Sequence, residues 1–326
     1  MLILTRADVA SLLDAGRLVD ALGEAMVDLS AGRASMPARI AARVSESDGR
    51  LFAMPAFVPS LEVLESKLVT LFPNNRDRPT HQAVILSFDP GSGTPSVLMD
   101  ATHITEMRTA AGSSLATRLL ARDDAKVLAV VGTGVQARSH ARLVVRERPF
   151  EQVLLSGRNP ERTSRVAAEL TEEMGRDVEA VPHVPSALER ADVVCAATHS
   201  SEPVVRRPWI RPGTHINSVG YNTAGREIDS AAVADALVVV ESRVAALAPP
   251  PSGSNDLLWP IRDGVIDESH VHAEIGEIVA GSATGRTSSD QITLYKSVGV
   301  AVQDAAAAAL VLEAARQQGV GTDFDL

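Results

Sequence analysis

The spacing of hydrophobic and polar positions changes along the chain, and each kind of spacing predicts a type of secondary structure. Over residues 5–33 apolar side chains recur every three or four positions, which is the spacing of an amphipathic helix. From Met36 to Leu98 the pattern breaks into short segments separated by proline and glycine, which predicts strands joined by turns. The strands are expected at 39–44, 50–54, 65–72, 81–89 and 96–100, followed by a helix at 105–122 with Thr105 as its cap.

From residue 127 onward, apolar runs alternate with helical or loop segments. Continuous apolar runs are typical of parallel strands that are buried on both faces. The expected strands are 127–131, 152–156, 178–181, 192–197, 215–219 and 236–240, with a helix at 160–174. A short helix at 273–279, a last strand at 291–295 and an alanine-rich helix at 296–318 complete the prediction. This alternation indicates an α/β fold with a doubly wound domain in the middle of the chain.

A glycine motif directly follows the first of these apolar runs, in the order Gly132-x-Gly134-x-x-Ala137. Glycine lets the backbone turn sharply and approach a ligand, and a helix N-terminus offers N–H groups to a pyrophosphate. Because a strand precedes the motif and a helical pattern follows it, the motif predicts a Rossmann dinucleotide site rather than an ordinary turn. The residues expected to contact the cofactor here are Gly132, Thr133, Gly134, Val135 and Gln136.

The end of the second expected Rossmann strand indicates which dinucleotide binds. NAD-binding domains carry an acid there, which accepts hydrogen bonds from the ribose 2′-hydroxyl. This chain has Ser156-Gly-Arg158-Asn159 instead. A carboxylate would repel the 2′-phosphate of NADP, whereas a guanidinium pairs with it. Arg158 and Asn159 are therefore expected at the cofactor, which is predicted to be NADPH, with NADH as the alternative.

Composition narrows the function classes. A chain of 326 residues is long for one domain, so two are expected. The formal net charge of −10 argues against nucleic acid or an anionic membrane as a partner. Cys195 is the only cysteine and lies in an apolar run, so it is expected to be a buried thiol, and no histidine or acid spacing predicts a metal site. No apolar run approaches the roughly 20 residues that span a bilayer, so a soluble cytoplasmic protein is expected.

Nine short stretches carry a resemblance when they are taken in order. They are Met36-Pro-Ala-Arg39, Met54-Pro-Ala, Ser66-Lys67-Leu-Val-Thr, His81-Gln-Ala, Ile104-Thr-Glu-Met-Arg108-Thr-Ala-Ala, Gly132-Thr-Gly-Val-Gln-Ala, Pro212-Gly-Thr-His-Ile-Asn-Ser-Val-Gly220, Glu274-Ile-Gly-Glu277 and Lys296-Ser297-Val-Gly. In this order and spacing the chain resembles the ornithine cyclodeaminase/mu-crystallin family over nearly its full length. That family includes cyclodeaminases, alanine dehydrogenases and imino acid reductases.

The resemblance implies a homodimer of two-domain chains. Residues 1–117 together with 296–326 would form an α/β domain for substrate binding and dimerisation, and residues 118–295 would form the Rossmann domain. It further implies that a carboxylate is held by Arg39, Lys67 and Arg108, with Lys67 and Arg108 catalytic. His81 and Asn222 are additional substrate-binding candidates, although a structural role for His81 is equally compatible with its position. The implied cofactor contacts beyond the glycine loop and strand tip are Arg108, Thr109, Thr198, Val219 and Ser297.

The residue types of the three implied cations agree with this role. Lys67 lies in an otherwise apolar stretch, where a cation needs a partner. Converging cations would bind a planar carboxylate and lower the proton affinity of Lys67, which would make it a proton donor or acceptor. The structural alternatives are an edge-strand lysine, a helix-surface arginine for Arg108 and a loop arginine for Arg39.

Two acids that the family's cyclodeaminases carry are absent here. Asn222 stands two residues after the Val-Gly of the fifth Rossmann strand, where they have an aspartate. Phe52 and Ala53 precede the Met-Pro motif, where they have a glutamate. An amide cannot act as a base, so the chain is expected to transfer hydride rather than deaminate ornithine. Glu227 and Asp229, which follow Asn222, are expected to be solvated loop acids.

The predicted function is therefore NAD(P)H-dependent reduction of an α-imino acid. The substrate would be cyclic, such as Δ1-piperideine- or Δ1-pyrroline-2-carboxylate, or acyclic. Alanine-type dehydrogenation and ornithine cyclodeamination remain alternatives. A non-catalytic NADPH-binding protein of the crystallin type is a further alternative, against which the retained set of pocket cations argues.

Overall fold

The computed structural model describes residues 1–250 and 252–325 and divides the chain into two compact units. Unit 1 comprises Met1–Arg108 and Gly299–Leu326, and unit 2 comprises Thr109–Val298. Helix α3 (Thr102–Leu120) contributes residues to both units.

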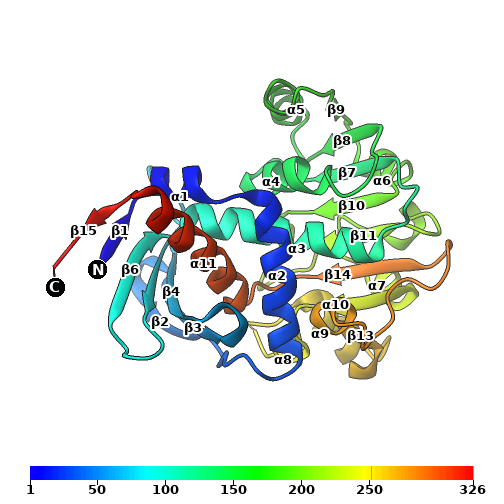
Figure 1. The fold of residues 1–326 in the computed structure, drawn as a ribbon. Coiled ribbons are helices and arrows are strands. Elements are labelled where there is room, and N and C mark those ends of the chain that lie inside the picture. The colour runs from blue at the N-terminus through cyan, green and yellow to red at the C-terminus, as the bar shows by residue number, and fades with distance from the viewer. Residues whose placement is uncertain (251, 326) are drawn as a thin grey trace. The chain divides into compact units, whose positions relative to one another are not determined.

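Unit 1 is a seven-stranded sheet with strand order β15-β1-β6-β5-β4-β3-β2 (Figure 1). Its strands are β1 (Leu2–Leu4), β2 (Ile40–Val44), β3 (Gly49–Val58), β4 (Val63–Leu71), β5 (His81–Phe88), β6 (Pro95–Asp100) and β15 (Thr322–Asp323). Its helices are α1 (Arg6–Leu12), α2 (Ala15–Ser30) and α11 (Ala301–Gln318), with single 3-10 turns η1 (Ser45–Ser47) and η2 (Pro59–Leu61). Strands β2 to β6 are antiparallel neighbours, and β1 runs parallel to β6.

The two faces of this sheet differ because side chains alternate along each strand. Helix α11 packs against β3 and β4 on one face and lies beside α2 (Figure 1). Lys67 on β4 belongs to the buried face and pairs across the sheet with Met54 and Ile85. The next residue, Leu68, pairs with Val84 and belongs to an exposed face.

Unit 2 is an eight-stranded sheet in which every neighbouring pair is parallel, with order β13-β12-β14-β11-β10-β7-β8-β9. Its strands are β7 (Val127–Val131), β8 (Gln152–Ser156), β9 (Glu179–Ala180), β10 (Val193–Ala196), β11 (His215–Ser218), β12 (Ala236–Val240), β13 (Val271–Glu274) and β14 (Ile292–Lys296). The order β9-β8-β7-β10-β11 is the Rossmann arrangement, in which ligands bind beyond the carboxyl ends of the strands where the order reverses. The expected α/β fold with a central Rossmann domain is therefore confirmed.

The helices of unit 2 include one whose limits match the expected range. Helix α5 (Pro160–Met174) begins after Asn159, whose side chain caps it, and ends at Gly175 with a positive φ of 62°. The remaining helices are α4 (Val135–Val144), α6 (Val184–Leu188), α7 (Ser230–Asp235), α8 (Arg243–Ala246), α9 (Asn255–Arg262) and α10 (Ile275–Val279), with 3-10 turns η3 (Arg207–Trp209) and η4 (Glu268–His270).

Two expected helix starts are wrong. Helix α3 begins at Thr102 rather than Thr105, because Asp100 Oδ1 accepts hydrogen bonds from the backbone N–H groups of the first two residues, at 3.1 and 3.2 Å. The C-terminal helix begins at Ala301 rather than at 296, because residue 296 ends β14 and Gly299 turns the chain with a φ of +76°.

Two other segments contain more elements than expected. Residues 5–33 form two helices, since Asp14 interrupts the first pattern and caps α2 by accepting from the Arg17 N–H at 2.7 Å. The predicted helix at 273–279 begins only at Ile275, because the preceding four residues form strand β13.

Cys195 is buried in β10, as expected, and burial raises the pKa of its thiol to about 12. A thiol with that pKa stays protonated and is a poor nucleophile. Among the described residues, no helix is long and apolar enough to cross a membrane. The described histidines, cysteines and acids also form no group of three or more that could hold a metal ion.

Candidate active site

The glycine motif of unit 2 forms a tight turn that a side chain would block. Gly132 has a φ of +127°, and a Cβ built there would lie 2.6 Å from the carbonyl oxygen of Ala197. Gly134 is the N-cap of α4, and no side chain caps that helix. The first turn of α4 can therefore offer N–H groups and the positive end of the helix dipole to an anion. These features fit the pyrophosphate of a dinucleotide.

The tip of β8 presents Arg158 at the surface. Among the described residues none forms a hydrogen bond or ion pair with Arg158, so its guanidinium can receive a phosphate. Asn159 is used locally, because its Oδ1 accepts from the Arg162 N–H at 2.9 Å. Arg162 in turn donates from Nη2 to the Thr133 carbonyl at 3.3 Å, which joins the β8 tip to the glycine loop.

Glu227 is a buried anchor rather than the solvated acid that we expected. Its carboxylate accepts from both N and Oγ1 of Thr198 at 2.7 Å, from Ser218 Oγ at 2.9 Å and from Gly220 N at 2.9 Å. The prediction failed because the chain after Asn222 returns to the carboxyl ends of β10 and β11, where Thr198 and Ser218 contact the carboxylate. Burial raises the pKa of Glu227, although Lys296 nearby opposes this effect.

Asp229 also departs from the expectation of a solvated acid. Its Oδ1 accepts from the Ala232 N–H at 2.8 Å and so caps α7. Its carboxylate additionally accepts from the Arg207 N–H at 3.2 Å. Asp229 therefore joins η3 to α7.

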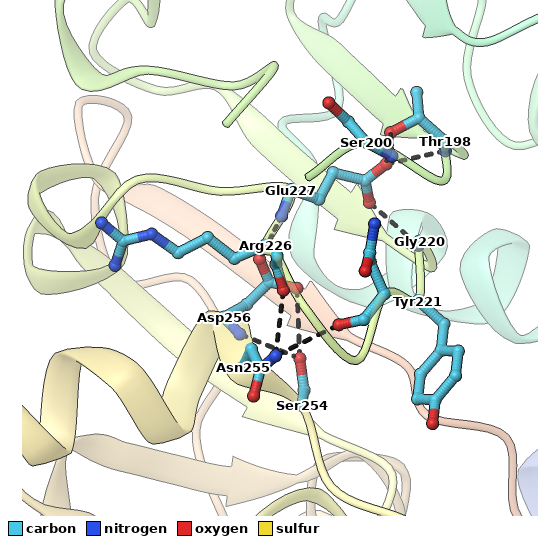
Figure 2. Close-up of a pocket in the computed structure, with 11 residues that line it drawn as sticks. Thr198, Ser200, Gly220, Tyr221, Arg226, Glu227, Ser254, Asn255 and Asp256 are labelled. Carbon is cyan, nitrogen blue, oxygen red and sulfur yellow. Dashed lines mark hydrogen bonds between the residues drawn. The ribbon is translucent and has the colours of Figure 1, made fainter. Parts of the chain in front are cut away.

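Lys296 and Asp256 complete this anchor. Lys296 Nζ lies 2.8 Å from Asp256 Oδ2 and donates to Ser218 Oγ at 3.0 Å and to the Gly220 carbonyl at 2.8 Å. Asp256 Oδ1 accepts from the backbone N–H of Glu227 at 2.7 Å. Figure 2 shows Glu227, Asp256 and the Thr198 loop around a small polar pocket. The loop that carries Val219 and its neighbours is thus held by charged groups that the sequence reasoning missed.

Hydrogen bonds also position three other residues of unit 2 that were predicted to contact cofactor or substrate. Ser297 is buried and donates from Oγ to Glu241 Oε1 at 2.8 Å. Val219 donates its N–H to the Ala196 carbonyl at 3.0 Å. Asn222 donates from Nδ2 to the His199 carbonyl at 3.3 Å. Thr109 is buried on α3, the first residue of unit 2.

The predicted cations of unit 1 gather at the start of α11. Lys67 Nζ forms an ion pair with Asp304 Oδ2 at 2.6 Å, and Arg108 Nε donates to Asp304 Oδ1 at 3.1 Å. Arg108 Nη1 also donates to Gln303 Oε1 at 3.0 Å. Arg39 Nη2 donates to the Gly299 carbonyl at 2.9 Å. Lys67 and Arg108 are buried, so neither is a surface residue.

The environment of Lys67 lowers its pKa below that of an exposed lysine. Burial is the main cause, and the positive charge of Arg108 adds to it, while the ion pair with Asp304 opposes both. An ammonium group in this position gives up its proton more readily than one in water. The lowered pKa of Lys67 therefore agrees with the lowered proton affinity that the sequence predicted.

Glu65 is an acid of this cluster that the sequence reasoning missed. It precedes Lys67 by two residues on β4, so both side chains lie on the buried face. Asp304 was missed as well, although an acid in an alanine-rich buried helix is itself a signal. The cyclodeaminase acids are absent from their usual positions, but the cluster contains these two carboxyl groups of its own.

His81 lies apart from the buried cluster. It begins β5, is exposed, and its Nδ1 is 3.3 Å from Thr80 Oγ1. In the sheet it pairs with Leu71, whereas Lys67 pairs with Ile85. Its predicted contact with substrate remains a prediction.

Comparisons with known proteins agree with this geometry. The sequence profile of the ornithine cyclodeaminase/mu-crystallin family matches residues 1–319. A Δ1-pyrroline-2-carboxylate reductase of Bacillus cereus is 34% identical over 325 residues, which cover 98% of each chain. The solved structure of Thermococcus litoralis Δ1-pyrroline-2-carboxylate reductase with NADH and L-proline is 40% identical, with a TM-score of 0.94 and coverage of 99% of this chain and 100% of that one. An archaeal alanine dehydrogenase dimer with bound NAD is 31% identical, with a TM-score of 0.92 and coverage of 100% and 99%.

The anchoring role of Glu227 predicts the effect of its removal. Glu227→Ala would leave two backbone N–H groups and two hydroxyls without their acceptor, which we expect to cost about 3 kcal/mol of unfolding free energy. Urea unfolding measures this loss, and titration with NADPH measures the accompanying loss of cofactor affinity. Glu172→Ala on the exposed surface of α5 is the control. Stability and affinity equal to those of the control would refute the anchor.

Proposed function

The chain belongs to the ornithine cyclodeaminase/mu-crystallin family, and on that premise we propose that it reduces an α-imino acid to the amino acid with NAD(P)H. The observation that carries this proposal is the buried pair of cations, Lys67 and Arg108, held on one carboxylate of Asp304. Burial raises the pKa of Glu65, so with that carboxyl group uncharged the two cations and Asp304 leave one positive charge, which suits the carboxylate of an α-imino acid. Relatives named Δ1-pyrroline-2-carboxylate reductase support that cyclic imine as the substrate.

In this proposal the side chains of unit 1 bind and orient the substrate. Arg108 and Arg39 hold the carboxylate, because a guanidinium can donate two parallel hydrogen bonds to it. Lys67 supplies the proton that the substrate nitrogen takes up as the C=N bond is reduced, and Asp304 keeps Lys67 in place. The reduced dinucleotide, bound at the glycine turn of unit 2, supplies the hydride.

The first test pairs a substrate assay with a change at Lys67. The wild-type protein is expected to oxidise NADPH or NADH with Δ1-pyrroline-2-carboxylate and to leave ornithine unchanged. Lys67→Met should lower kcat by roughly a hundredfold or more, because the proton donor is lost, while cofactor affinity stays unchanged. Lys126→Met, at an exposed ion pair with Glu151, is the matched control.

Each contrary outcome has a distinct meaning. Retained turnover with lost cofactor affinity in Lys67→Met would overturn the role of Lys67. An absolute need for free ammonium would favour alanine-type dehydrogenation. Proline formed from ornithine would mean that cyclodeamination does not need the missing acids. Tight NADPH binding without turnover across imino acids would favour a non-catalytic ligand-binding protein.

We also propose that NADPH is preferred over NADH, on the basis of Arg158. Its exposed guanidinium at the β8 tip has no acidic neighbour in the Gly157–Asn159 turn and can pair with a 2′-phosphate. The neighbouring structures contain NADH or NAD, so this preference would distinguish the chain from them.

Removing that guanidinium should therefore affect one cofactor alone. Arg158→Ala is expected to lower kcat/KM for NADPH roughly thirtyfold, which corresponds to about 2 kcal/mol for a charge-assisted hydrogen bond. The value for NADH should not change, because NADH lacks the 2′-phosphate. Steady-state kinetics with both cofactors, beside the exposed control Arg146→Ala, decide the point. Equal losses with both cofactors would contradict it.

We further propose a cytoplasmic homodimer in which a second copy covers the exposed face of the unit 1 sheet. Ile40, Leu68 and Val84 lie in one cross-strand row with Ala53, and their exposed fractions are 71%, 37% and 40%. An apolar row across four strands is typical of an interaction surface. The archaeal alanine dehydrogenase described as a dimer supports a second copy as the partner.

A charge placed in this row should separate the copies. Leu68→Glu is expected to convert the protein to monomers, since a dimer would bury the carboxylate against apolar side chains. Light scattering after gel filtration gives the mass, and Val244→Glu, at a more exposed valine of unit 2, is the control. A Leu68→Glu protein with the wild-type mass would exclude this face as the interface.

A further inference from the structure

Glu65 differs from every other buried acid discussed above. Its exposed fraction is 2%, and among the described residues neither carboxyl oxygen has a hydrogen-bond partner. Its neighbours across the sheet are Ala56 on β3 and Ser87 on β5, which carry no charge. A buried carboxylate normally pairs with a cation or with several N–H groups, and leaving it bare is costly.

The charged groups that act on Glu65 come from two elements. Asp304 on α11 repels a negative charge at Glu65, and Lys67 on the same strand attracts one. Burial has the largest effect, and the pKa of Glu65 lies well above its ordinary value. Lys67 in turn responds to Asp304 on α11, Arg108 on α3 and Glu65 on its own strand.

The rows of the sheet around this pair contain no other ionisable group. The Lys67 row continues through Met54, Ile85 and Met99, and the Glu65 row through Ala56, Ser87 and Val97. The two groups therefore share one apolar surface, where a charge on one is felt strongly by the other because the local dielectric is low.

We propose that Glu65 is a positioning residue of the reduction site, which acts through Lys67 by setting how firmly its ammonium group holds the proton. This inference rests on the proposed function, in which Lys67 supplies the proton to the substrate nitrogen. At low pH Glu65 is uncharged and leaves the net positive charge of the cluster for the substrate carboxylate. As the pH rises Glu65 ionises, and its negative charge keeps Lys67 protonated over a wider pH range.

The sign of this effect follows from the charges. An ionised Glu65 raises the pKa of Lys67, whereas a glutamine at the same position cannot. In Glu65→Gln, Lys67 must therefore lose its proton at a lower pH than in the wild-type protein. Where both groups are protonated, the variant and the wild type carry the same charge and should have the same activity.

The test is the pH dependence of kcat/KM with Δ1-pyrroline-2-carboxylate. In Glu65→Gln the alkaline limb is expected to move down by roughly one pH unit, which means about tenfold lower kcat/KM on that side and no change at acidic pH. Glu65→Met, similar in length and without polar atoms, should show the same shift, and Glu65→Asp should retain the wild-type limb. Glu172→Gln, an exposed acid on α5, is the control.

The outcomes separate this inference from the proposed function. Wild-type-shaped profiles in both Glu65→Gln and Glu65→Met, with active wild-type protein, would overturn the role of Glu65 alone. A wild-type protein without turnover on imino acids would overturn the proposed function. In that case the titration of Lys67 by NMR of lysine-labelled protein still tests Glu65, because its pKa must fall in Glu65→Gln and an unchanged pKa would refute the coupling.

Discussion

The carboxylate of Asp304, buried between Lys67 and Arg108, is the interaction on which unit 1 depends. Each of these charges would be costly to bury alone, and removal of one partner from a buried pair typically costs about 3–5 kcal/mol. The three side chains come from β4, α3 and α11, so their pairing fixes the last helix against the sheet. Because one anion serves two cations, the cluster is stable and still retains positive charge for a carboxylate.

The buried acids of unit 2 are likewise satisfied by their partners. Glu227 accepts four hydrogen bonds, and Asp256 pairs with Lys296 while accepting from backbone N–H groups. Acids that are satisfied in this way position loops, and their cost of burial is offset by the bonds. Glu65 lacks such bonds and lies beside a lysine of lowered pKa, and this combination makes it a candidate for a functional role.

The sequence predicted those parts of the fold and site that depend on local signals. The glycine motif identified β7 and α4, and the predicted range 160–174 matched the limits of α5. The sequence also indicated that Lys67 needs a partner, but it could not identify Asp304, which comes from the far end of the chain. The burial of Glu227 was not predicted, because it depends on how the chain after Asn222 returns to the ends of β10 and β11. Glu65 could have been found, since alternate strand residues share a face.

Two roles are proposed for unit 1, substrate reduction through Lys67 and dimerisation through the row that contains Leu68. Both depend on the register of β4, because its side chains alternate between the two faces of the sheet. Lys67 points to the buried cluster, and Leu68, the next residue, belongs to the exposed apolar row. A shift of this strand by one residue would bury the leucine and expose the lysine, because side chains on a strand alternate between faces. The ion pair with Asp304 opposes that shift, since it would leave a buried anion without one of its cations. The same contact that holds the proposed proton donor therefore also keeps the apolar row on the exposed face of the sheet.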